Sequence, residues 1–244
     1  MPGIKKIIRK TFLILLILIP VLTLAHYAIF PHESRAILID YAGFKKDDRL
    51  FYNTHVPQNK IDSLKALIEQ AKNRMLTFWG EKRSNPKFIY CSDAVDFNKY
   101  SIAPAAPAVT YLKLGSYIVL SNDGMDLDII AHEISHAEFY ERVGFFKWNF
   151  SIPAWFKHGL AMQNDYRNYY SEDTLRVKSN NFTNLPNIKL YKKDDEFYAG
   201  THDEVMLNYM TAKHAVKNWY SKAKLDKLIK DLNSGKSFEK AFDQ

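Results

Sequence analysis

The pattern of apolar and polar residues changes sharply about thirty residues into the chain. Residues 11–30 carry no formal charge apart from a possible one on His26, and they are rich in Leu and Ile. Twenty such residues are enough for a helix to cross the roughly 30 Å hydrocarbon layer of a bilayer. The pattern therefore predicts a transmembrane helix at residues 11–30.

Beyond residue 30, apolar positions recur at helical spacing. One run occupies residues 58–79 and stops at Gly80; another occupies 127–143, contains neither Pro nor Gly, and stops at Gly144. A glycine directly after the last apolar position is a common helix stop. Further helices are expected at residues 93–100, 152–162, 203–219 and around the apolar stripe 225–232.

Short apolar runs between these helices predict a small sheet. Residues 87–91 have the character of one strand, and 109–112 with 117–121 have that of a hairpin. The Ala- and Pro-rich stretch 102–108 is expected to be an extended loop. No internal repeat and no linker divides residues 31–244, a length that one domain accommodates. We expect an α+β fold for this domain.

The run 127–143 contains the motif His132-Glu133-Ile134-Ser135-His136, an H-E-x-x-H pattern. On a helix, His132 and His136 lie one turn apart on one face, where two imidazoles can bind the same Zn²⁺. Glu133 then lies beside the metal without binding it and can take a proton from water that the metal activates. The competing interpretation is a buried helix whose two core histidines are hydrogen-bonded. The charges between residues 129 and 143 argue against an intramembrane protease.

A catalytic zinc site usually has three protein ligands. Glu138 fits badly because it lies two residues after His136, which turns it roughly 200° around the helix. His158 is the better candidate, since the segment 152–162 reads as a helix started by Pro153 that places His158 one turn beyond Ala154. The predicted metal ligands are therefore His132, His136 and His158.

The H-E-x-x-H motif is followed about twenty residues later by the segment 153–161, PAWFKHGLA. This combination resembles the gluzincin metallopeptidases, whose pattern is P-x-W-[FL]-x-E-G-[LM]-A, and in particular their small thermolysin-like bacterial domains, which often have a membrane anchor. The resemblance covers most of the chain after residue 50. It implies a zincin-like fold with a mixed sheet, Zn²⁺ as cofactor, and a strand beside the active-site helix that binds a peptide or protein substrate. We expect the hairpin to provide that strand.

The family has a Glu at the third ligand position, where this chain has His158. Three imidazoles still bind zinc and activate water, because imidazole is a normal third ligand in other zinc hydrolases. The site would carry one more net positive charge than one with a Glu. The alternative outcome is a site that binds metal but has lost most of its turnover, or one that His158 does not reach.

A second resemblance lies downstream of the proposed ligands. Tyr198-Ala199-Gly200-Thr201 looks like the family's Y-x-x-[SG] element, whose Tyr donates a hydrogen bond to the oxyanion of the tetrahedral intermediate. The resemblance implies this role for Tyr198, with Tyr209, His202 and His214 as weaker candidates. The polar, turn-rich residues 181–197 are expected to form a mobile loop near the cleft.

The charges of the chain are unevenly distributed. The formal net charge is +7, and Lys5, Lys6, Arg9 and Lys10 contribute four positive charges before the apolar stretch, leaving three for residues 31–244. The positive-inside rule places residues 1–10 in the cytoplasm and the domain outside it, periplasmic or extracellular. A signal peptide cleaved near residues 23–25 is the alternative. A domain so close to neutral gives no reason to expect a nucleic-acid partner.

The single cysteine, Cys91, excludes an internal disulfide and a Cys-rich zinc site, and is expected to be a buried apolar residue. The sequence thus predicts a membrane-anchored, extracytoplasmic zinc metallopeptidase with Glu133 as base and Tyr198 on the oxyanion. The alternative is a catalytically weakened gluzincin-like domain that acts as an anchored peptide-binding or assembly module.

Overall fold

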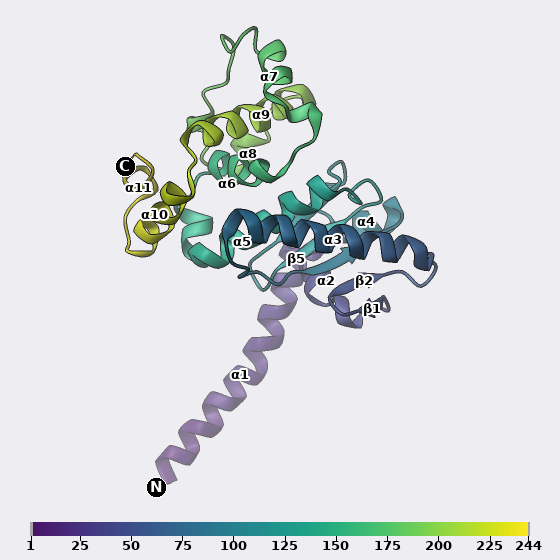
Figure 1. Ribbon diagram of the computed structural model, residues 1–244. Coiled ribbons are helices and arrows are strands. Elements are labelled where there is room, and N and C mark those ends of the chain that lie inside the picture. Colours follow the sequence, from purple (N-terminus) through teal and green to yellow (C-terminus); the bar gives the residue numbers. More distant parts are fainter. Residues whose placement is uncertain (1, 244) are drawn as a thin grey trace.

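The computed structural model describes residues 2–243 (Figure 1). Met1, in the predicted basic segment 1–10, and Gln244, at the end of the predicted domain 31–244, lie outside the described residues. A long helix, α1 (Pro2–Ile29), extends away from the other elements, which gather around a small sheet and a group of helices (Figure 1). The class is α+β, as the sequence predicts.

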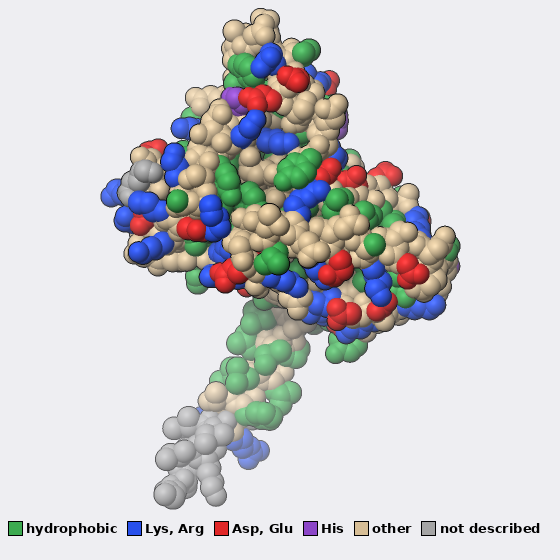
Figure 2. Space-filling model, viewed as in Figure 1, with side chains coloured by type: hydrophobic (Ala, Val, Ile, Leu, Met, Phe, Trp, Pro, Cys, Tyr) green, Lys and Arg blue, Asp and Glu red, His purple; other side chains and the backbone are tan. Residues whose placement is uncertain are grey.

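One part of α1, Arg9–Ile29, is long and apolar enough to cross a membrane, with a mean hydropathy of 2.5, and none of it is buried against the rest of the protein. It coincides closely with the predicted segment 11–30. Figure 2 shows hydrophobic side chains along this helix, whereas Lys, Arg, Asp and Glu are scattered over the surface of the domain. The prediction of a long apolar helix is confirmed, while its orientation in a membrane stays a prediction.

The sheet has five strands in the order β1-β2-β3-β5-β4. Its centre is β3 (Lys87–Tyr90), which pairs in parallel with β2 (Leu50–Tyr52) and β5 (Tyr117–Leu120). The outer strands, β1 (Lys45–Asp47) and β4 (Ala108–Tyr111), are antiparallel to β2 and β5. The predicted strand and hairpin are confirmed. Strands β1 and β2 could not be predicted from the sequence, because three residues are too few to show alternation.

Alternate residues of the central strands point to opposite faces of the sheet. Phe88 and Ile118 belong to the larger core, whereas Ile89, Val119 and the fully buried Cys91 belong to the smaller one. The larger core lies against α3 (Gln58–Trp79) and α5 (Leu127–Phe150); the smaller lies against α2 (Pro31–Ile37), the 3₁₀ helix η1 (Ile39–Tyr41) and α4 (Ala94–Tyr100).

Helix α5 carries the H-E-x-x-H motif and starts at a strong N-cap. The Asp126 side chain accepts hydrogen bonds from the backbone N–H groups of Asp128 and Ile129, which satisfies two unpaired donors of the first turn. Gly144 has φ 78° and ψ 168°, so the regular helix breaks where the sequence predicts a stop. The chain then resumes helical turns to Phe150, because nothing in residues 145–150 prevents a helix.

The carboxyl-terminal third is mostly helical, as predicted. Its helices are α6 (Ala154–Ala161), α7 (Glu172–Lys178), α8 (Asp194–Phe197), α9 (His202–Trp219), α10 (Lys222–Asn233) and α11 (Phe238–Phe242), with the 3₁₀ turns η2 (Met162–Asn164), η3 (Asn168–Tyr170) and η4 (Ile188–Leu190) between them. The segment 181–197 is therefore not simply an irregular loop, since it includes η4 and α8.

Candidate metal centre

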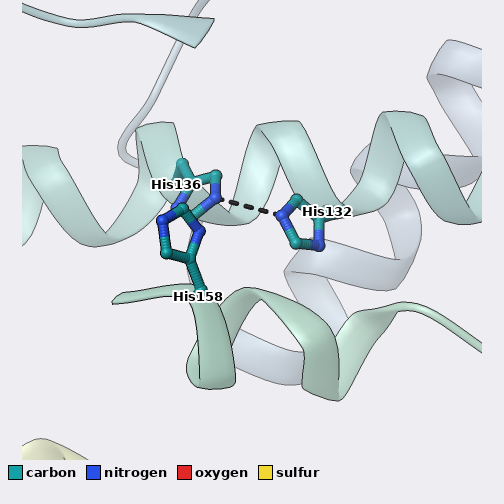
Figure 3. A group of neighbouring side chains, drawn as sticks. All are labelled: His132, His136 and His158. Carbon is teal, nitrogen blue, oxygen red and sulfur yellow. Dashed lines mark hydrogen bonds between the residues drawn. The ribbon is translucent and has the colours of Figure 1, made fainter. Parts of the chain in front are cut away.

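Three histidine rings meet between α5 and α6 (Figure 3). His132 and His136 project from α5, and His158 projects toward them from α6. The Nε2 atoms of His132 and His136 are 3.1 Å apart. One nitrogen from each of the three rings can be chosen so that no two are more than 4.8 Å apart. The structure thus brings together the three predicted ligands from positions up to 26 residues apart.

A close approach between two helices places His158. An added Cβ on Gly159 would lie 2.5 Å from the carbonyl oxygen of Ala212 and 2.7 Å from a methyl group of Val216, both on α9. Only glycine allows α6 and α9 to come so near. At the start of α6, the backbone N–H of Ala154 donates to the carbonyl of Lys192. Backbone packing therefore fixes the position of the third imidazole.

Burial holds the three imidazoles in their neutral form. The side chains are almost completely buried, at 7–8% exposure. Desolvation lowers the pKa of His132 to about 3, and it also lowers the pKa values of His136 and His158. A neutral imidazole is the form that binds a metal ion. The cluster is thus a set of ligands that needs no deprotonation at neutral pH.

The hydrogen bonding of the three rings is incomplete. Their Nδ1 atoms are buried and have no hydrogen-bond partner among the described residues. A neutral imidazole offers one N–H and one lone pair. At 3.1 Å, the facing Nε2 atoms of His132 and His136 must either share one proton or direct both lone pairs toward a common cation. A zinc ligand usually donates its other N–H to a carboxylate or carbonyl, and the rings of His132 and His136 have no such partner in the described part of the chain.

Glu133 lies in the same cleft and is held by one hydroxyl. Thr110 Oγ1 on β4 donates to Glu133 Oε2 at 2.6 Å. Desolvation raises the pKa of Glu133 to about 7, although the bond from Thr110 opposes the rise. A carboxyl group whose pKa is near neutral can both accept and release a proton. The hairpin was expected beside the motif, but Thr110 was not predicted from the sequence.

The sequence places Tyr198 near the site, and the structure brings it there together with Tyr209. The Tyr198 hydroxyl is 3.2 Å from Nε2 of His158 and 2.9 Å from the hydroxyl of Tyr209. Desolvation raises the pKa values of both phenols, so both remain proton donors. Asp194 Oδ1 also lies 3.3 Å from Nε2 of His158. Asp194 was missed because nothing in the sequence links it to the motif.

The two weaker histidine candidates lie elsewhere. His202 is exposed at the start of α9 and does not line the cleft. His214 lies 3.4 Å from Glu172 and stacks on Phe182. Glu138 also points away from the three rings, as its helical position predicts. Its carboxylate bonds Ser84 and Arg142 instead.

A cleft of about 630 Å³ surrounds the cluster. The whole of β4 lines one wall, and this strand has a neighbour on one side only because it ends the sheet. Lys157 and Trp148, which the sequence did not single out, also line the cleft. The cleft also contains the three histidines, Glu133, Tyr198 and Tyr209. It can hold an extended chain of atoms next to the nitrogen cluster.

Comparisons with known proteins add no identification: no family model matches this chain, and no curated protein matches its sequence.

Proposed function

We propose that this protein is a membrane-anchored, extracytoplasmic zinc metallopeptidase. The observation that carries the proposal is the convergence of His132, His136 and His158 in one cleft with the carboxyl group of Glu133. Two ligands spaced by one helical turn, a third from another helix and an adjacent carboxylate are the parts that metal-assisted peptide hydrolysis needs. The zincin-like fold and the likeness to gluzincins belong to this proposal.

The donor set fits Zn²⁺ better than a hard cation. All three donors are buried neutral imidazoles, which suit zinc and other transition metals, whereas Mg²⁺ and Ca²⁺ prefer oxygen ligands. The unpaired ring nitrogens and the close Nε2 pair are consistent with a shared cation. When bound there, Zn²⁺ would supply a Lewis acid that polarises a carbonyl and lowers the pKa of water.

The proton chemistry falls to Glu133. Its carboxyl group, with a pKa near 7, would accept a proton as the nucleophile forms and deliver that proton to the leaving amine. Thr110 fixes the carboxyl rotamer through its hydroxyl. Because the donor is on β4 and the acceptor on α5, the hydrogen bond also sets the distance between the strand and the base.

Two phenols are available for the oxyanion. Tyr198 and Tyr209 share a hydrogen bond and line the cleft beside the histidines. A preorganised donor at the developing negative charge contributes roughly 3–4 kcal/mol in comparable enzymes. The free edge of β4 would hold the substrate backbone as an added strand. This assignment selects one strand of the hairpin for which the sequence left both open.

The anchor part of the proposal rests on α1 and its flanking charges. Arg9–Ile29 has the length and apolarity of a membrane span, and basic residues precede it. The positive-inside rule would then leave residues 31–244 outside the cytoplasm.

One observation favours the alternative of an anchored peptide-binding module. Nε2 of His158 is approached by both Asp194 and Tyr198, at 3.3 and 3.2 Å. If these contacts persist when a metal is present and Nδ1 of His158 does not reach the ion, the metal is held by two imidazoles. Such a site would keep its groove and lose most of its turnover.

Metal analysis and peptide cleavage of the full chain test the proposal. We expect one zinc per chain, hydrolysis of casein, and a fall in kcat/KM of roughly 10²- to 10⁴-fold in Glu133→Gln. His136→Ala should lose the metal and the activity together. Glu141→Gln, an exposed change on the same helix, is the matched control and should behave as wild type. Bound zinc without any cleavage, and no difference in Glu133→Gln, would support the binding module instead.

A further inference from the structure

Three phenylalanines beyond the kink of α5 are exposed to solvent. Phe145, Phe146 and Phe150 have exposures of 38, 76 and 77%. Their rings contact one another, with centroids 5.4 to 6.5 Å apart. A contiguous exposed aromatic patch is uncommon on a soluble surface and marks a site of contact with an apolar partner. We call these three residues the aromatic patch.

Neighbouring residues of the same segment line the same cavity as the end of the apolar helix. Trp148 and Asn149 line the cleft, and so do Ile29 and Phe30, the last residues of the apolar stretch. Arg9–Ile29 would span about 30 Å as a helix, which matches the hydrocarbon layer. Ile29 therefore marks the level of the membrane–water interface on the side of the domain, and the aromatic patch belongs to a segment that lines the same cavity as Ile29.

The junction between α1 and α2 is one non-helical residue, Phe30, which is hydrogen-bonded to both helices. The backbone N–H of Phe30 donates to the carbonyl of His26, and that of Ser34 donates to the carbonyl of Phe30. Nδ1 of His26 also lies 2.7 Å from the hydroxyl of Ser34. Backbone hydrogen bonds thus continue from α1 into α2 without a flexible linker. The domain has a defined orientation relative to α1.

The tip of the β4–β5 hairpin supplies a second contact at this level. Lys113 Nζ lies 3.9 Å from the centroid of the Phe30 ring and 3.5 Å from a carboxylate oxygen of Glu33. The next residue, Leu114, has 61% exposure. An exposed apolar side chain therefore directly follows a residue that contacts the end of α1.

We propose that Phe145, Phe146 and Phe150 lie in the interfacial region of the lipid bilayer that α1 spans, so that the cleft opens at the membrane surface. This inference rests on the anchor part of the proposed function and is independent of its chemistry. Aromatic side chains favour the membrane–water interface. The occupant is lipid rather than a second protein because the segment that carries the patch shares a cavity with the end of a helix suited to a bilayer.

The consequence for the site concerns which chains can reach it. One cavity is lined both by Ile29 and Phe30 and by the three histidines. A substrate would therefore enter next to the lipid surface. The class that fits this position is a polypeptide segment that emerges from the same membrane, or one tethered to it.

Site-specific fluorescence in lipid vesicles tests the contact with the full-length chain. A solvent-sensitive fluorophore is attached to Phe146→Cys, and quenching is measured in phosphatidylcholine–phosphatidylglycerol vesicles whose lipids carry a nitroxide near the headgroup. Cys91 is fully buried and burial raises the pKa of its thiol, so it does not compete for the label. Val177→Cys on α7, at 81% exposure and far from α1 in Figure 1, is the matched control.

We expect the probe at 146 to be quenched at least fivefold more strongly than the probe at 177, with a blue-shifted emission. Phe150→Cys should give the same result, which guards against a folding defect specific to position 146. Quenching at 146 and 150 no greater than at 177 would overturn the inference. A probe at Leu22→Cys in α1 separates the two failures: its quenching shows that the anchor is in the bilayer even if the patch is not.

Discussion

Helix α5 carries two groups of buried polar side chains less than two turns apart. One group has incomplete hydrogen bonding, and the other has complete hydrogen bonding. His132 and His136 face the cleft, with buried Nδ1 atoms that have no partner among the described residues. Glu138 and Arg142 lie further along the helix, with exposures of 1 and 6%. The second pair has partners for its charges, whereas the first has nitrogen atoms without them.

Glu138 and Arg142, which we call the closed pair, have hydrogen-bond partners from several parts of the chain. Glu138 accepts hydrogen bonds from the backbone N–H and hydroxyl of Ser84, at 2.9 and 2.7 Å, and from the backbone N–H of Arg83. Arg142 forms an ion pair with Glu138 and donates to the carbonyl of Glu81. Its guanidinium group also lies over the Trp79 ring, 4.4 Å from the centroid. These contacts join α5 to the segment after α3.

The difference separates a structural role from a chemical one. Buried polar groups in native proteins are nearly always paired, because an unpaired one costs roughly 1–3 kcal/mol. A network that is complete without a ligand serves the fold. A set of buried nitrogens that remains incomplete can accommodate a group absent from the polypeptide, and three imidazoles are a donor set that can hold a metal ion.

The largest expected effect on stability belongs to the closed pair. Glu138→Ala leaves the Arg142 charge buried without its partner and removes the acceptor of three donors, so we expect a loss of about 3–5 kcal/mol in the free energy of unfolding. Urea unfolding of the full chain in detergent measures it. Glu141→Ala, exposed and one turn earlier than Phe145, is the control and should change stability by less than about 0.5 kcal/mol. A loss below about 1 kcal/mol for Glu138→Ala would remove the contrast between the two groups.

The ligand geometry was the part of the site that the sequence predicted best. His132 and His136 are separated by one helical turn, a spacing that local structure alone determines. The convergence of His158 depends on how α6 lies against α5. The sequence offered His158 as a candidate because it lies on a predicted helix that starts at Pro153, and the resemblance to a known pattern pointed to the same position. Asp194 and Thr110 could not be found in this way, because each reaches the site through tertiary packing of an element with no motif of its own.

The fold shows the same division. The long helices α3 and α5 follow from apolar spacing and glycine stops, and the hairpin follows from its alternation and turn. The order of the strands could not be derived, since pairing between β3 and β5 is set by contacts distant in sequence. The short strands β1 and β2 were missed for want of length, and segment 181–197 was assigned too little structure because its helical pieces have three and four residues.

A smaller effect on stability is expected at the three histidines, which we call the open group, because packing rather than hydrogen bonding holds them in place. In an uncrowded helix, Gly→Ala would stabilise by roughly 0.4–1 kcal/mol. The methyl group of Gly159→Ala would overlap the carbonyl oxygen of Ala212, so we expect a loss of about 1–3 kcal/mol and weaker zinc binding as His158 shifts. Urea unfolding and zinc titration measure the two effects. A gain in stability would mean that α6 and α9 are not in the close contact described.

The smallest effect concerns the single hydrogen bond that links Glu133, beside the open group, to the sheet. Thr110→Val keeps the shape of the side chain and removes the hydroxyl that donates to Glu133 at 2.6 Å. We expect kcat/KM for peptide cleavage to fall by roughly fivefold, equivalent to about 1 kcal/mol, because the carboxyl group loses the contact that orients it. Steady-state cleavage of a fluorogenic peptide measures the change.

Thr110→Ser restores the hydroxyl and should recover most of the activity, and neither variant should alter the zinc content, since Thr110 is not among the proposed ligands. A structural role alone would give the opposite pattern, with Ser, the smaller side chain, destabilising β4 more than the isosteric Val. Equal activity in the Val and Ser variants would therefore remove Thr110 from the site. It would leave Glu133 oriented by the helix, and the distinction between the two polar groups of α5 would then rest on the histidines alone.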